Sequence, residues 1–225
     1  MLVAALLPAI ILGFYIWYKD AKPEPARWLF RALLAGIGIC IPVAMVENYI
    51  SGLLFANGTP TTLFGTTIEA FFVAAIPEEA AKLLALWLVL RKNPYFDERF
   101  DGIVYAVFVG LGFAGIENVF YVTGSGDEWV TVAVMRALLS VPGHYAFAIM
   151  MGYYYTMYHF VKRTPLNAVL ILLVPVLAHG VYDALAMSGS VDPLAGGISF
   201  LILIYFCIRL QRAAQRKVMA LAENG

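Results

Sequence analysis

The sequence predicts an all-α protein, a polytopic transmembrane helical bundle with about seven spans. Hydrophobic residues make up 62% of the 225 residues and charged residues 13%, whereas globular proteins contain roughly 45–50% and about 25%. Apolar stretches recur along the whole chain, and Lys and Arg gather in alternate connections between them. The formal net charge of zero leaves no basic surface for nucleic acid. The length fits a single membrane-embedded domain over residues 1–225.

Seven stretches approach the roughly 20 apolar residues that a helix needs to cross the hydrocarbon core. The third and the fifth are the longest, and they contain Pro77 and Pro142-Gly143. We expect these two helices to be tilted or broken there. The predicted spans are Leu2–Tyr18, Trp28–Ile50, Leu63–Leu90, Gly102–Val122, Val130–Phe160, Leu166–Met187 and Leu194–Leu210.

Lys and Arg predict the orientation, because cytoplasmic connections carry an excess of both. The segments around 19–31, 91–99 and 162–163 and the segment after 209 are basic, whereas 51–62, 123–129 and 188–193 contain neither residue. The N-terminus is therefore expected outside and the C-terminus in the cytoplasm. Short connections without a large outer domain indicate a prokaryotic plasma membrane. Lys82 and Arg136 are the only basic residues outside these cytoplasmic segments.

The third span contains two adjacent carboxylates and an ammonium group. Glu78 and Glu79 precede Lys82 by four and three residues, so all three share one side of the helix. Adjacent carboxylates in a medium of low dielectric constant cannot both ionise cheaply. One of the two glutamates is therefore a candidate general base, with Lys82 keeping the other charged. The alternative is a structural ion pair that joins helices.

Three later spans add ionisable residues at a similar depth. Glu117 and Asn118 lie toward the outer end of the fourth span, where Glu117 could alternatively extend to the interface. His144 follows Pro142-Gly143 in the fifth span, and His179 and Asp183 are four residues apart in the sixth. A single histidine in a span is more often a hydrogen-bonding residue than a metal ligand. Glu47 and Glu69, near span ends, are expected at the membrane interface.

Together these residues predict one polar layer between the membrane midplane and its outer surface. Charges inside a bilayer cost at least about 2.5–3.5 kcal/mol each, and they usually mark function. We therefore expect a catalytic core over about 63–187. Asp183 is expected to orient His179 or to share a metal with it.

These motifs resemble the PrsW family of intramembrane proteases, which are related to CAAX-prenyl endopeptidases and bacteriocin-processing membrane proteases. The resemblance rests on four motifs in the family's order: Glu78-Glu79-Ala80-Ala81-Lys82, the segment from Gly110 to Asn118, Pro142-Gly143-His144, and His179 to Asp183. It implies proteolysis with Glu78, Glu79, Glu117, His144 and His179 as catalytic residues. It also implies a cleavage like the first cut of an anti-sigma factor, on the outer side of a bacterial membrane.

The sequence leaves the cofactor open. A divalent metal, zinc by expectation, would be held by Glu117, His144 and His179, but the HExxH motif of zincins is absent and a metal-free mechanism is equally compatible. Lys82, Asn118 and Asp183 would support the centre, Asn118 by binding an oxyanion.

The predicted function is hydrolysis of a peptide bond in a membrane-anchored substrate, either a single-span protein or an anchored peptide, by an activated water molecule. The alternative is a transporter or proton-relay protein that uses the same Glu and His residues. Transporters often contain internal repeats. The absence of a convincing repeat and the few titratable residues in the inner halves of the fourth and sixth spans favour the protease.

Overall fold

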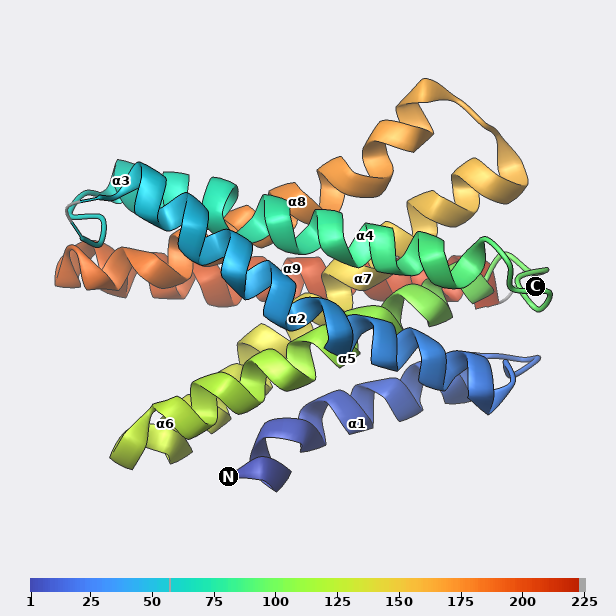
Figure 1. Ribbon diagram of the computed structural model, residues 1–225, viewed down its shortest axis with the longest axis horizontal. Helices are drawn as coiled ribbons and strands as arrows, with labels where there is room; N and C mark the ends of the chain where they lie inside the picture. Colours follow the sequence, from blue (N-terminus) through green and yellow to red (C-terminus); the bar gives the residue numbers. More distant parts are fainter. Residues whose placement is uncertain (57, 223–225) are drawn as a thin grey trace.

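The computed structural model describes residues 1–56 and 58–222, and every regular element in this part of the chain is helical. Figure 1 shows the long helices running back and forth along one direction, with the turns gathered at two ends. The elements are α1 (Leu2–Lys19), α2 (Ala26–Leu54), α3 (Leu63–Ile68), η1 (Glu69–Ala75), α4 (Ile76–Leu90), α5 (Asp101–Gly124), η2 (Gly126–Glu128), α6 (Trp129–Met135), η3 (Arg136–Ser140), α7 (Val141–Thr156), η4 (Met157–Val161), α8 (Pro165–Met187), η5 (Ser188–Ser190) and α9 (Pro193–Ala222).

Six stretches of the described chain are long and apolar enough to cross a membrane: Leu2–Lys19, Ala26–Leu54, Asp101–Gly124, Gly126–Val161, Pro165–Ser190 and Pro193–Ala222. They coincide with six of the seven predicted spans. The remaining predicted span, Leu63–Leu90, is formed by α3, η1 and α4, which follow one another without interruption. It contains Glu78, Glu79 and Lys82. The prediction of an all-α transmembrane bundle is confirmed, and the chain is a multi-pass membrane protein.

The two long helices that were expected to be tilted or broken at Pro77 and Pro142 are not broken there. Instead, each proline lies in the first turn of an α-helix that follows a π-helical segment, η1 before α4 and η3 before α7. Pro is well accommodated in the first turn of a helix, where its missing N–H is not needed. The wider π turn absorbs the change in hydrogen bonding.

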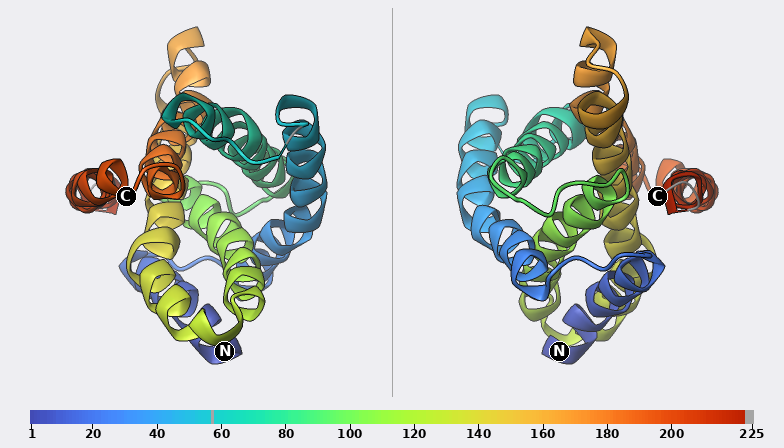
Figure 2. Two further views of the ribbon diagram at one scale, coloured as in Figure 1. Left: turned by 90° about the vertical axis from the view of Figure 1, so that its left-hand side faces the viewer. Right: turned by 90° about the vertical axis from the view of Figure 1, so that its right-hand side faces the viewer.

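Helix α5 lies at the centre of the bundle and packs against α1, α2, α4 and α7. Glycines allow the closest of these approaches. A methyl group at Gly152 of α7 would overlap the carbonyl oxygen of Gly102 of α5, and one at Gly36 of α2 would overlap that of Val109. Small residues at helix interfaces let backbones approach closely in membranes. Figure 2 shows α9 at the periphery of the bundle, where it contacts α7 and α8.

Candidate active site

Two helices direct acidic and histidine side chains toward the centre of the bundle, and both do so just after a π-helical segment. In one, η1 is followed by Pro77, Glu78 and Glu79; in the other, η3 is followed by Pro142, Gly143 and His144. A π segment shifts the helical register, so the residues after it face a different direction from those of a continuous α-helix. A preceding π-helical segment thus sets the direction of the Glu78-Glu79 pair in one helix and of His144 in the other.

The side chains of Glu78, Glu79 and Lys82 form a buried cluster. The three residues are only 4%, 0% and 3% exposed. The ammonium Nζ of Lys82 lies 2.8 Å from Glu78 Oε2 and 2.8 Å from Glu79 Oε1. It also lies 4.2 Å from the ring centroid of Phe113. Glu79 Oε2, in contrast, is buried and has no hydrogen-bond partner in the structure. One carboxylate oxygen in the centre is therefore free to act.

His144 links this cluster to Glu117. Its Nδ1 lies 3.2 Å from Lys82 Nζ, and its Nε2 lies 3.0 Å from Glu117 Oε2. An ammonium group can only donate hydrogen bonds. Nδ1 must therefore accept, and the hydrogen-bond partners assign the ring proton to Nε2, which donates to Glu117. Arg136 also donates to Glu117 Oε2, over 2.6 Å.

His179 lies between two carboxylates on the other side of the cluster. Its Nδ1 is 2.9 Å from Glu79 Oε1, and its Nε2 is 3.2 Å from Asp183 Oδ2. His179 is 3% exposed, and its ring stacks on Phe147 with the centroids 4.8 Å apart. The ring is thus fixed in both plane and direction.

The structure brings together all the predicted catalytic residues, Glu78, Glu79, Glu117, His144 and His179, with Lys82 and Asp183 in contact with them. Asn118 lies differently from the expectation. Its side chain is fully buried, its Nδ2 donates to the Ala5 carbonyl over 2.6 Å, and its Oδ1 accepts from Arg136 over 2.7 Å. Both ends of the amide are occupied, so this geometry gives no support to an oxyanion role for Asn118.

Sequence reasoning missed two participants in the site. Glu47 of α2 was expected at the interface, but it is half-buried and close enough to Glu78 and Glu117 for their charges to interact. Arg136 was noted as an intramembrane charge without a role, and it contacts both Glu117 and Asn118. The position of Glu47 near the end of a span gave no indication of a role in the site. A basic residue inside a span is rare, and this rarity did single out Arg136.

Four of these side chains are arranged as metal ligands could be. Glu78, Glu79, His144 and His179 are all buried and offer ligand atoms within 4.8 Å of one another. The unpartnered Glu79 Oε2 is an available donor atom. Carboxylate and imidazole groups suit zinc and other divalent transition metals. A divalent cation therefore fits the donor set, although the Lys82 ammonium, in contact with three of the four residues, would have to move away from it.

The metal ligands predicted from the sequence overlap this group only in part. His144 and His179 belong to it, but Glu117 does not. Glu117 contacts Nε2 of His144, and the glutamate oxygen of this contact, Oε2, also accepts a hydrogen bond from Arg136. In this geometry Glu117 orients the His144 ring through the hydrogen bond to Nε2. Glu78 and Glu79 would supply the carboxylate ligands that were expected from Glu117.

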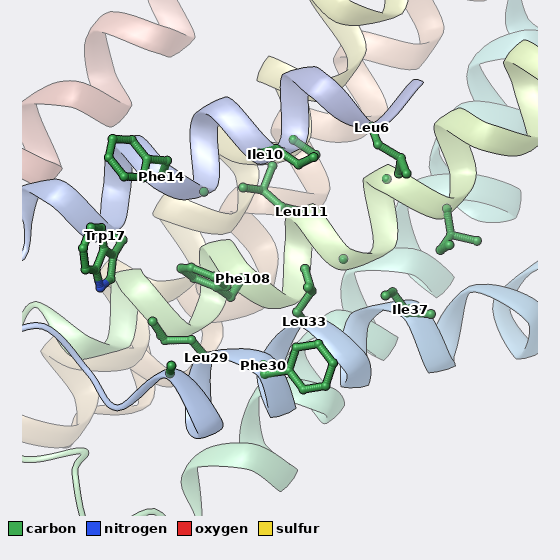
Figure 3. Close-up of a pocket in the computed structure, with 16 residues that line it drawn as sticks. Leu6, Ile10, Phe14, Trp17, Leu29, Phe30, Leu33, Ile37, Phe108 and Leu111 are labelled. Carbon is green, nitrogen blue, oxygen red and sulfur yellow. The ribbon is translucent and has the colours of Figure 1, made fainter. Parts of the chain in front are cut away.

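A large apolar groove lies on the far side of α5 from this site. It has a volume of about 600 Å³ and is lined by residues of α1, α2 and α5 (Figure 3). On α5 it is lined by Leu111, Gly112 and Gly115, whereas Phe113 and Glu117 face the polar cluster. Successive residues of a helix lie about 100° apart, so these are different faces. The groove is separate from the candidate active site.

Comparison with known proteins gives a consistent result. The chain is 35% identical to Protease PrsW of Clostridioides difficile over 83% of this chain and 79% of that protein. It is 33% identical to Protease PrsW of Oceanobacillus iheyensis over 97% of this chain and 98% of that protein. It is also 33% identical to Protease PrsW of Bacillus subtilis over 80% and 79%. No solved structure matches the chain.

The family described as PrsW family intramembrane metalloprotease matches residues 24–210, which include the whole polar cluster. The resemblance seen in the sequence motifs is therefore confirmed. The chain belongs to the PrsW family of intramembrane proteases.

Proposed function

We propose that the chain hydrolyses a peptide bond of a membrane-anchored substrate with Glu79 as the general base. The observation that carries this assignment is Glu79 Oε2, a fully buried carboxylate oxygen without a hydrogen-bond partner. The other oxygen of Glu79 is held by Lys82 and His179. A carboxylate fixed on one side and free on the other is suited to take a proton from an attacking water.

His179 would deliver a proton to the leaving amine. Its two nitrogens face carboxylate oxygens of Glu79 and Asp183, which only accept, so both nitrogens carry protons; after the ring gives one to the leaving amine, the proton that Glu79 took from water replaces it. Asp183 supports the charged form of the ring during this transfer. Lys82 holds both glutamates in position and balances their charge. On the other side, His144 accepts from Lys82 and donates to Glu117, and it helps to hold the ammonium group beside the glutamates.

A divalent metal would be held by Glu78, Glu79, His144 and His179. When bound, it would supply Lewis acidity, which polarises a peptide carbonyl and makes water a stronger acid.

The substrate we propose is a single-span membrane protein, cut on the outer side of the bacterial plasma membrane in a manner like the first cleavage of an anti-sigma factor. Support comes from the bacterial relatives named Protease PrsW and from the placement of the polar layer in the outer half of the bundle in the predicted orientation. The protease relatives also favour this function over the transporter alternative.

The test uses the full chain purified in detergent and a panel of single-span substrates. We expect Glu79→Gln to lower kcat at least about 10²-fold, as loss of a general base does. Glu128→Gln, a change of the same chemistry at an exposed position, should leave cleavage intact. Near-normal cleavage by Glu79→Gln would overturn the assignment of the base.

Metal content and chelator sensitivity, measured on the same preparations, decide the cofactor. Stoichiometric zinc that is lost in His179→Ala, with cleavage abolished by chelator, would establish a metalloprotease. Cleavage that continues without bound metal would place the chemistry on the glutamates and His179 alone.

A further inference from the structure

Arg136 is a charged residue inside a membrane helix that no step above requires. It is the first residue of η3, and its side chain is only 15% exposed. An arginine at such a position costs at least about 2.5–3.5 kcal/mol on insertion scales, and residues of this kind are usually retained for function. It also lies eight residues before His144, on the same continuous helix.

The guanidinium group of Arg136 is held by three residues of α5. Nε donates to Asn118 Oδ1 over 2.7 Å, and one terminal nitrogen donates to Glu117 Oε2 over 2.6 Å. The group also lies over the ring of Tyr121, with Cζ 4.0 Å from the centroid. Asn118 is itself fixed by its bond to the Ala5 carbonyl. The planar fork of arginine suits two acceptors at once, which a lysine cannot match.

The contact between Arg136 and Glu117 affects His144 because Arg136 and His144 bind the same oxygen of Glu117. Glu117 Oε2 accepts from Arg136 and also from His144 Nε2. With its proton on Nε2, His144 turns the lone pair of Nδ1 toward Lys82 and the glutamate pair. A metal ion bound in place of the Lys82 ammonium group would also need the lone pair of Nδ1 directed toward it. Without Arg136, Glu117 would be free to rotate away, and the Nε2–H of His144 would lose its hydrogen-bond acceptor, although Lys82 would still keep the proton on Nε2.

We propose that Arg136 is a positioning residue that fixes Glu117 and, through it, the orientation of the His144 ring. The role in catalysis rests on the proposed protease function, but the effect on the His144 ring does not. A purely structural ion pair between η3 and α5 is the competing interpretation. It predicts a loss of stability without a selective change in kcat or in the hydrogen bond of the His144 Nε2–H.

The test compares Arg136→Met, Arg136→Lys, Glu117→Gln and the double variant Arg136→Met/Glu117→Gln in the full chain. We expect Arg136→Met to lower kcat about tenfold or more with KM within about twofold, since small misplacements of a catalytic group are costly. Arg136→Lys keeps the charge but loses the fork, so it should recover only part of kcat. The double variant should be no worse than Glu117→Gln, because Arg136 acts through Glu117.

A second readout does not depend on activity. In protein labelled with ¹⁵N-histidine, the imidazole nitrogens of His144 report which one carries the proton. We expect Nε2 to be protonated in both proteins, because Lys82 faces Nδ1, and the resonance of the Nε2–H proton to shift in Arg136→Met as its hydrogen bond to Glu117 weakens. Arg209→Met, which removes an arginine that contacts only a tyrosine of its own helix, should change neither the spectrum nor kcat.

Additive losses in the double variant, or an unchanged Nε2–H resonance of His144 in Arg136→Met, would overturn the proposal. If Arg136→Met fails to fold, Arg136→Lys decides by the same spectrum and by its partial kcat. If the wild-type chain cleaves no substrate, the protease proposal fails, whereas the spectrum of His144 still judges the role of Arg136.

Discussion

Removing the ammonium group of Lys82 tests the electrostatic account of the site most directly. Lys82→Met keeps a flexible side chain of similar length but leaves Glu78 and Glu79, both nearly inaccessible, without their shared cation. Breaking a buried ion pair by removing one partner costs about 3–5 kcal/mol. For a protein of this size, each kcal/mol lowers Tm by about 2–4 °C. We therefore expect Tm to fall by about 6–20 °C in detergent.

The double variant Lys82→Met/Glu78→Gln separates charge from packing. Removing one carboxylate with the ammonium group relieves the repulsion between the glutamates, so at least half of the lost stability should return. Lys217→Met is the matched control: this lysine lies over the Tyr153 ring at 3.8 Å, a contact worth about 0.5–1 kcal/mol. If Lys82→Met unfolds within about 1 kcal/mol of the wild type, or if Glu78→Gln lowers its stability further, the buried-pair account is wrong.

Three other predictions concern packing, pH and orientation. Gly152→Leu should destabilise the chain by about 3 kcal/mol or more through overpacking, because a side chain there meets the backbone of α5, whereas Gly38→Leu, with no atom within 4 Å, should be neutral in thermal unfolding. Burial raises the pKa of Glu24 above its ordinary value of 4.5, so the folded chain binds more protons than the unfolded one and stability falls as pH rises through the folded pKa. Glu24→Gln should reduce this slope and raise stability at pH 8 in thermal unfolding; an unchanged slope would contradict the pKa assignment. With both native cysteines buried, a cysteine at Ser190 should react with an impermeant maleimide added to intact cells and one at Arg212 should not, and the reverse pattern would invert the predicted orientation.

The membrane spans could be predicted because hydropathy and length alone determine them. Predicted and observed helix ends agree within a few residues for most spans, and α9 continues beyond the prediction because its last turns are polar. The π segments could not be predicted from these patterns. Two of the three in the described chain, η1 and η3, directly precede a helix with a proline in its first turn, whereas η4 does not, so proline alone does not predict where a π segment forms.

Within the site, contacts along one helix were predictable and contacts between helices were not. The three- and four-residue spacings gave the Glu78–Lys82, Glu79–Lys82 and His179–Asp183 contacts, because helical geometry fixes them locally. The contacts of Lys82 with His144 and of Arg136 with Glu117 depend on how α4, α5 and α7 are rotated against one another. No spacing in the sequence contains that information, so the motifs alone could not separate Glu117 from the metal-ligand group.

The contact network also explains how so many ionisable groups can be buried in one bundle. From Arg136 the contacts run through Glu117, His144 and Lys82 to the glutamate pair, and from Glu79 through His179 to Asp183. Each member has a partner of opposite charge or a hydrogen-bonding imidazole, which offsets the cost of its desolvation. The unpartnered Glu79 Oε2 is then the exception within the network. It is the one buried oxygen of the described network without a partner, and because it is an acceptor, a water molecule gains a hydrogen bond by binding there; for that reason we place the chemistry there.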